Sequence, residues 1–271
     1  MQLVEIEDPS DPRLGDYADV RDPVWLRRRD VFLVEGVTLV EKLLCSPRFH
    51  TRSLAVTATA LERIAPALVG RGVTVFRVAA QTLAAVAGVR FHQGCVAVAE
   101  PPPDPGLGVL LSQGARRWLV LENVSDPDNV GGVFRCARAF GADGIALGPG
   151  CAHPLYRKTT RTALGATLEM PFTRVEDWPW ALKLFREFGL RLLGLTPHGP
   201  AVNLGRLGRF EPLPKRFALL VGHEGHGLSE AALGHCDQRV RIAMAPDVDS
   251  LNVAMAAGIA LHWLASELRR H

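Results

Sequence analysis

Residues 217–268 constrain the fold of this chain more than any other stretch. An apolar run at residues 217–221 is followed by the polar segment GHEGHG, and a second run at residues 240–244 is followed by APDVDS. Runs without polar alternation are typical of strands buried on both faces, as in parallel sheets. Since open α/β sheets bind ligands at the carboxyl ends of their strands, the pattern predicts a ligand site. Taken alone, it is equally consistent with ordinary strand-to-helix turns.

The end of this stretch predicts a long helix at residues 251–268, rich in alanine and leucine. Ser250 is the predicted N-cap, because its hydroxyl can accept a hydrogen bond from the first turn. Arg269 and Arg270 follow the helix and carry the charge that a helix C-terminus favours.

The whole chain has 271 residues, enough for one large domain or two ordinary ones, and its hydrophobic content of 48% suits a packed core. The formal net charge is only +3, so a nucleic-acid surface would need local clustering of basic residues. The five cysteines form no CxxC pair, and the N-terminus has no apolar signal region. We therefore expect a cytoplasmic protein with reduced thiols.

The N-terminal residues 1–100 are predicted to form a small α/β/α domain. Residues 1–22 are rich in proline and acidic residues and are expected to be a loose arm or a short helix. Strands are predicted at 31–34, 53–56, 73–78 and 95–99, and helices at 38–44, 60–68 and 81–87. The proline-rich segment 101–117 is the predicted linker, without regular structure.

A second domain is predicted at residues 118–271. A buried strand starts at residue 118, the turn residues 126–129 follow, and a helix is expected at 133–140. Further strands are expected at 144–147 and 191–195, helices at 157–165 and 176–188, and a loop at 198–211. The alternation indicates parallel strands.

Three segments of this domain resemble the motifs of the SpoU (TrmH) branch of the SPOUT RNA methyltransferases. They read NVGGVFRCARAFG at 129–141, VGHEGHGLS at 221–229 and RIAMAPDVDSLNVAMAAGIAL at 241–261. The resemblance implies a parallel sheet with a deep trefoil knot, S-adenosylmethionine as cofactor, and a homodimer whose sites are completed across a two-fold interface. Sequence physics alone would not suggest a knot, because threaded chains are nearly absent among folds.

The resemblance also implies the reaction, which is methylation of a ribose 2'-hydroxyl in RNA, with 23S ribosomal RNA favoured over transfer RNA. By position in the motifs, the catalytic residues are Asn129, Arg135, Glu224, Ser250 and Asn252. Arg138 is the alternative to Arg135, since it lies three residues further along the same helix. The structural alternative for any of these arginines is a surface salt bridge.

The arginine in such a site has two conceivable roles. Removing a proton from a guanidinium near neutral pH costs about 7 kcal/mol, because the pKa of arginine is about 12.5. We therefore favour a bidentate grip on the phosphate beside the target ribose over a role as general base.

The resemblance assigns cofactor contacts mainly to backbone groups, at Leu220, Val221, Gly222, Ile242, Ala243, Met244 and Leu251. One departure is Pro246, where the family usually has glycine. Because proline fixes φ and lacks an N–H, it can alter this loop and weaken cofactor binding.

The segments FLVEG and FHQGCVAVA resemble an N-terminal substrate-binding domain of these enzymes, which implies that the first domain docks RNA. Basic side chains at two places are the predicted phosphate contacts: Arg27, Arg28, Arg29, Arg157, Lys158 and Arg161. The alternative for the arginine run is a solvated helix face.

Other kinds of functional site lack their characteristic residues in this sequence. His223 and His226, with His235 and Cys236 nearby, lack the spacing of a zinc site, so no metal is predicted. No GxSxG, Walker or GxGxxG motif is present. The remaining alternatives are a transfer RNA 2'-O-methyltransferase, a base-nitrogen methyltransferase, a ribosome-protecting resistance enzyme, and a non-catalytic RNA-binding or ribosome-assembly factor.

Overall fold

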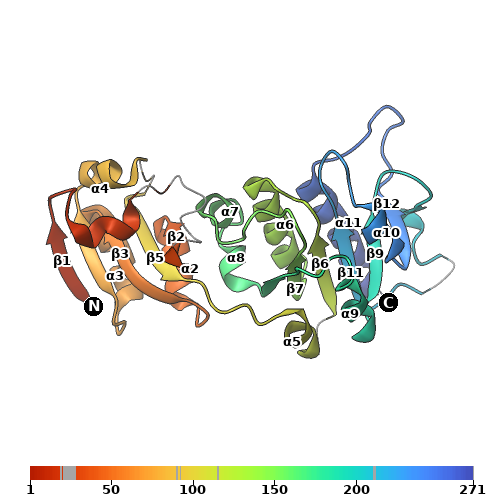
Figure 1. Ribbon diagram of the computed structural model, residues 1–271, viewed down its shortest axis with the longest axis horizontal. Helices are drawn as coiled ribbons and strands as arrows, with labels where there is room; N and C mark the ends of the chain where they lie inside the picture. Colours follow the sequence, from red (N-terminus) through yellow and green to blue (C-terminus); the bar gives the residue numbers. More distant parts are fainter. Residues whose placement is uncertain are drawn as a thin grey trace. The chain divides into compact units, whose positions relative to one another are not determined.

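The protein is described by a computed structural model, shown in Figure 1. The described residues are 1–18, 20, 29–89, 91, 93–114, 116–209 and 212–270. The chain divides into two compact units. The first consists of Met1–Pro103 and Leu155–Glu169, and the second of Asp104–Pro154 and Met170–His271. Residues 155–169, which we predicted with the C-terminal domain, thus cluster with the N-terminal unit.

The first unit contains a mixed sheet in the order β1-β4-β3-β5-β2. β1, β4 and β3 run parallel, and β5 is antiparallel to both β3 and β2. Its strands are β1 (Gln2–Ile6), β2 (Phe32–Glu35), β3 (His50–Val56), β4 (Thr74–Val78) and β5 (Cys95–Glu100). Its helices are η1 (Pro12–Tyr17), α2 (Val37–Cys45), α3 (Ala58–Leu68), α4 (Ala80–Ala87), α7 (Arg157–Thr162) and α8 (Ala166–Glu169).

The sheet of the first unit is covered on both faces. Leu14 and Tyr17 of η1 and Leu83 of α4 belong to one hydrophobic cluster with the strands. α2 and α3 contact each other and contribute buried residues such as Leu43 and Ile64. Of the expected loose arm or short helix at residues 1–22, the short helix is confirmed as η1, but the loose arm was wrong, because residues 2–6 pair with β4 as a parallel edge strand.

The second unit contains a parallel sheet in the order β10-β12-β9-β11-β6-β7-β8. Its strands are β6 (Arg117–Leu121), β7 (Gly144–Leu147), β8 (Phe172–Arg174), β9 (Arg191–Leu195), β10 (Val202–Asn203), β11 (Phe217–Val221) and β12 (Gln238–Arg241). Its helices are α5 (Leu107–Ser112), α6 (Pro127–Ala139), α9 (Leu182–Glu187), η2 (Leu204–Arg206), α10 (Glu230–Gly234) and α11 (Val253–Arg270). The predicted α/β class with a parallel sheet is confirmed.

Helices lie on both faces of this sheet. Alternate strand residues, such as Trp118 and Val120, pack in one cluster with side chains of α5, α9 and α10. On the other face, α6 and α11 lie side by side (Figure 1). A Cβ at Gly132 of α6 would lie 2.7 Å from the Cβ of Ala254, and one at Gly258 of α11 would lie 2.9 Å from Sγ of Cys136. Glycine is therefore required at both crossing points.

The connection between β9 and β11 takes an unusual route. β9 and β11 are neighbours, but the chain between them forms β10, which lies beyond β12 at the far edge of the sheet. The chain that leaves β9 therefore passes the position of β12 to form β10 at the sheet edge, and it then returns to the centre of the sheet as β11. β12 and α11 follow later in the chain. Within the described ranges, no helix is long and apolar enough to cross a membrane.

Several predicted boundaries in the second unit were wrong. α6 begins at Pro127 instead of residue 133, so Asn129 lies in a helix and not in a loop. β12 ends at Arg241, which leaves residues 242–244 beyond the strand. The segment 107–112 forms α5, although it lies in the predicted linker. The helix predicted at 176–188 shortens to α9, and the predicted loop 198–211 contains β10 and η2.

Candidate functional site

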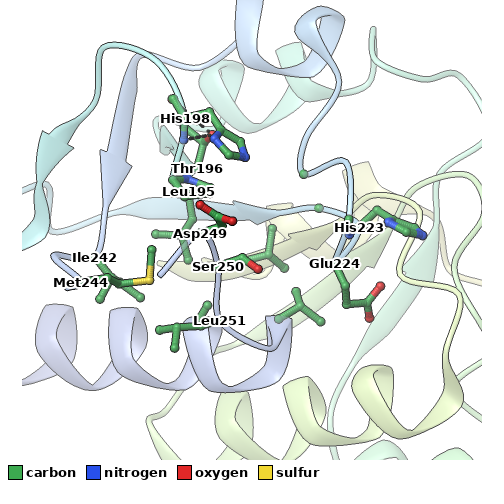
Figure 2. Close-up of a pocket in the computed structure, with 17 residues that line it drawn as sticks. Leu195, Thr196, His198, His223, Glu224, Ile242, Met244, Asp249, Ser250 and Leu251 are labelled. Carbon is green, nitrogen blue, oxygen red and sulfur yellow. Dashed lines mark hydrogen bonds between the residues drawn. The ribbon is translucent and has the colours of Figure 1, made fainter. Parts of the chain in front are cut away.

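A cavity of about 340 Å³ lies at the carboxyl ends of β9, β11 and β12. Figure 2 shows its two sides. Ile242, Met244 and Leu251 gather on one side, and His223 and Glu224 lie on the other. The volume and the mixed apolar and polar lining are typical of small-molecule sites.

The structure brings most of the predicted cofactor residues to this cavity. Its lining includes Val221, Gly222, Ile242, Met244 and Leu251. Leu220 is instead buried in the hydrophobic core, and Ala243 is exposed and does not line the cavity.

The sequence analysis missed the part of the lining at and just after the end of β9, which is Leu195, Thr196, Pro197 and His198. The sequence did contain evidence for this part of the site, since β9 was predicted at the correct residues. Its pairing with β11 and β12 places its carboxyl end at the same sheet edge.

Three predicted catalytic residues meet beside the cavity. The side-chain amide of Asn129 donates a hydrogen bond to Oε1 of Glu224. Nδ2 of Asn252 donates to Oδ1 of Asn129 at 2.7 Å. One residue from each of the three motifs therefore forms a continuous hydrogen-bonded chain.

Both asparagines are held by helix N-termini. Asp126 caps α6 by accepting from the N–H of Asp128 at 2.9 Å, and Pro127 occupies the first turn, where no N–H is needed. Oδ1 of Asn252 accepts from the N–H of Ala254 at 3.0 Å and of Met255 at 3.3 Å. The predicted N-cap Ser250 was therefore wrong, because Asn252 caps α11. Ser250 lines the cavity instead.

Arg135 lies on α6 but not on the same face as Asn129. Six residues along a helix rotate the side chain to a direction about 120° away. Arg135 is exposed, and in the described part of the chain neither a hydrogen bond nor an ion pair holds it. Arg138 is also exposed. The guanidinium of Arg135 is thus available to a ligand.

A buried carboxylate joins the loops that surround the site. Glu122 follows β6 and is 2% exposed. It accepts from Trp178 Nε1 at 2.6 Å, from Ser229 N–H at 2.8 Å and from Ser229 Oγ at 2.7 Å. Ser229 in turn caps α10. Glu122 was not predicted, although a polar residue directly after a buried strand was visible in the sequence.

The predicted RNA-binding residues have varied surroundings in the first unit. Arg157 donates to the buried Glu35 at 3.0 Å and lies 5.7 Å from the Phe91 ring centroid. Arg161 lies 3.8 Å from the same carboxylate and is more exposed, and Lys158 is exposed. Arg157 therefore offsets a buried negative charge.

The arginine run near the N-terminus lies mostly outside the described residues. Arg27 and Arg28 belong to the part of the chain that is not described. Nη1 of Arg29 donates to the carbonyl of Gly15 at 2.6 Å. Among described residues, no group of three or more histidine, cysteine or acidic side chains is placed to hold a metal ion.

Comparison with known proteins decides the family. A sequence model described as the SpoU rRNA Methylase family matches residues 116–262. The chain belongs to the SpoU rRNA methylase family. The resemblance inferred from the three motifs is confirmed, and so is the prediction of an RNA methyltransferase at the level of this family.

Two relatives of this SpoU methylase align over nearly all of its length. An uncharacterised tRNA/rRNA methyltransferase from Mycobacterium bovis is 39% identical over 266 residues, covering 97% of this chain and 91% of that protein. The 23S rRNA (guanosine(2553)-2'-O)-methyltransferase RlmP from Bacillus subtilis is 28% identical, covering 97% and 99%.

Solved structures show the same fold. The S-adenosylmethionine-bound rRNA methyltransferase from Sinorhizobium meliloti superimposes with a TM-score of 0.84 at 25% identity, covering 99% of both chains. AviRb from Streptomyces viridochromogenes, in complex with the same cofactor, gives a TM-score of 0.82 at 23% identity, covering 96% of this chain and all of that one. SpoU methylases of known structure therefore share the architecture described above.

Proposed function

We propose that this SpoU methylase transfers a methyl group to a ribose 2'-hydroxyl, and that its substrate is 23S ribosomal RNA. The observation that carries the proposal is the Glu224–Asn129–Asn252 chain at the rim of the cavity. A relative that aligns over 97% of this chain, RlmP, has this activity by name.

S-adenosylmethionine is the cofactor, and when bound it supplies an electrophilic methyl group. The cavity suits it, because apolar side chains can pack against a nucleoside base. Leu195, Ile242, Met244 and Leu251 provide these walls. The hydroxyls of Thr196 and Ser250 and the backbone near Gly222 offer polar partners along the same lining.

The residues of the chain must place the ribose and provide a route by which its hydroxyl proton leaves to solvent. Asn129 is oriented from two sides, since it donates to Glu224 and accepts from Asn252. This arrangement fixes the Glu224 carboxylate at the rim, where it can order the ribose hydroxyl. Such preorganisation lowers the cost of reaching the reactive geometry.

We assign the phosphate grip to Arg135. Its guanidinium has no partner among the described residues and can form a bidentate contact with a phosphate. Because it faces about 120° away from Asn129 around α6, we propose that it serves the cavity of a second subunit.

We therefore propose that the protein is a homodimer. α11 exposes Met255 and Ile259, one turn apart, at 62% and 45% of their surface. Large exposed apolar side chains on one helix face are typical of interaction surfaces. We assign this face to the contact with a second copy.

We also propose a knotted C-terminal segment and an RNA-docking first unit. The outward route of the β9–β11 connection around β12 supports a knotted C-terminal segment. We assign RNA docking to the first unit, with Lys158 and Arg161 as candidate phosphate contacts beside the less available Arg157. The domain boundaries at residues 100 and 118 remain predictions.

The test is transfer of labelled methyl from S-adenosylmethionine to ribosomal and transfer RNA, followed by digestion to dinucleotides. We expect label in 23S RNA within a nuclease-resistant dinucleotide, and its loss in Asn129→Ala. Label confined to transfer RNA would reject 23S ribosomal RNA as the substrate. Label in a base would reject the ribose 2'-hydroxyl as the methylated group. Absence of label in every RNA, with the protein folded, would favour a non-catalytic RNA-binding factor.

A further inference from the structure

The loop at residues 223–227 presents Glu224 to Asn129 and has an unusual internal support. His223 and Gly227 close it with two backbone hydrogen bonds, one at 3.1 Å and one at 2.8 Å. Inside this turn, the N–H of Gly225 donates to Nδ1 of His223 at 2.8 Å, and the N–H of His226 donates to the same atom at 3.4 Å. The imidazole therefore satisfies amides that the tight turn leaves without carbonyl partners.

These contacts determine the protonation of the ring. A backbone N–H can only donate, so Nδ1 must carry a lone pair, and the neutral ring holds its proton on Nε2. If Nδ1 carried a proton, its N–H would face the N–H groups of Gly225 and His226, and neither hydrogen bond could form. The closed loop thus requires an imidazole whose Nδ1 is unprotonated.

We propose that His223 is a positioning residue for methyl transfer, whose neutral imidazole folds the 223–227 loop and thereby sets the position of Glu224. This inference rests on the proposed function of Glu224. His223 does not need to touch the RNA or the cofactor to act in this way.

Other titratable groups surround His223. His226 stacks on it, with ring centroids 5.2 Å apart and planes 25° apart. Glu224 is its neighbour on the loop and contacts Asn129 of α6. His198, after β9, and Asp249, before α11, line the same cavity. The contribution of the His223 ring to activity must therefore be isolated by substitution.

Asparagine is the informative replacement. Its Oδ1 is as many bonds from the backbone as Nδ1 of histidine, and asparagine side chains commonly accept from the amide two residues further on. His223→Asn therefore keeps the acceptor and removes the ring. His223→Ala removes both, and His226→Asn removes the stacked ring but leaves the acceptor in place.

The experiment compares kcat for methyl transfer in the wild type and these three variants. We expect His223→Asn and His226→Asn to stay within about twofold of the wild type, and His223→Ala to be about tenfold slower, because a small misplacement of a catalytic group lowers the rate strongly. Equal rates for His223→Ala and His223→Asn would overturn the proposal.

A second measurement does not depend on activity. Nitrogen-15 spectra of the imidazoles distinguish a bare Nδ1 from a bare Nε2, and the His223 signals are those lost in His223→Asn. We expect Nδ1 of His223 to be unprotonated at neutral pH in the protein without RNA. A bare Nε2 would overturn the inference even in an active enzyme. A bare Nδ1 with no methyl transfer to any RNA would instead reject the proposed function.

Discussion

Asn252 donates its side-chain amide to Oδ1 of Asn129 at 2.7 Å, and Oδ1 of the same Asn252 accepts from the N–H groups of Ala254 and Met255 in the first turn of α11. The cap of one helix therefore orients a residue in the first turn of another. Because Asn129 also contacts Glu224, the position of the carboxylate depends on both helix N-termini.

This dependence predicts non-additive substitutions. Asn129→Ala and Asn252→Ala should each lower kcat, by about 100-fold and about 10-fold, because residues in one hydrogen-bonded chain act together. The double variant should be within about threefold of Asn129→Ala. Single-turnover kinetics measures the effect, with Asn203→Ala as the control, since the Asn203 side chain caps η2 by accepting from the N–H of Gly205. If the loss of kcat in the double variant equals the product of the two single losses, the three residues do not act as one hydrogen-bonded chain.

The assignment of Arg135 to a second subunit predicts complementation. Asn129→Ala and Arg135→Ala proteins should each be inactive, but mixed dimers contain one site with both residues intact. After co-refolding of equal amounts, we expect about a quarter of the wild-type rate, since half the dimers are mixed and each has one working site. No recovery, despite exchange of subunits, would place both residues in the same subunit's site.

The role of Arg135 as a phosphate grip predicts the behaviour of Arg135→Lys. Lysine keeps the charge but lacks the planar fork, so kcat/KM should fall about tenfold while the pH profile keeps its shape. If the arginine were the base, the basic limb would move by about two pH units, because lysine loses its proton near pH 10.4 and arginine near 12.5. A pH series of methyl transfer rates separates the two outcomes, and Arg138→Lys is the matched control.

Burial of Glu122 predicts a large loss of stability on truncation. Glu122→Ala leaves the donors of Trp178 and Ser229 without their acceptor, at a cost of about 3 kcal/mol. Glu122→Gln should cost less, because it retains one acceptor oxygen. Urea unfolding followed by circular dichroism measures both. Glu230→Ala is the control, since its side chain is 85% exposed and its removal should change stability by less than about 0.5 kcal/mol.

Burial also predicts which thiols react. Desolvation raises the pKa of Cys95 to about 12, of Cys151 to about 11 and of Cys236 to about 12. Only the thiolate reacts, so these three should resist iodoacetamide at mildly alkaline pH, and the exposed Cys45 should be modified first. Mass spectrometry of digests taken over time reports the order, and Cys45→Ser should remove the fast phase. Early modification of Cys95 would show that the first unit opens readily.

Much of the second unit's sheet was predictable because its strands are buried on both faces. The predicted strands 144–147, 191–195 and 217–221 coincide with β7, β9 and β11. Uninterrupted apolar runs leave little ambiguity about where such strands begin and end. β1 was missed for the opposite reason, since its residues are mostly exposed and its pairing with β4 provides the stabilisation.

The identity of the site residues was predictable from the sequence, but the helix starts and caps on which they lie were not. Asp126 and Pro127 were interpreted as a turn, although the same residues also favour a helix start, and only packing distinguishes the two. Ser250 and Asn252 are both good caps, and the choice of Asn252 follows from its contact with Asn129 on a helix more than a hundred residues earlier. Local propensity contains no information about such a partner.

The two glycine crossings of α6 and α11 have a consequence for engineering. Because Gly132 meets Ala254 and Gly258 meets Cys136, neither helix surface can accept a larger residue unless the other changes as well. A chimaera between this protein and a relative should therefore exchange the two helices as a pair. Grafting α11 alone would shift the cap at Asn252 and move the site with it.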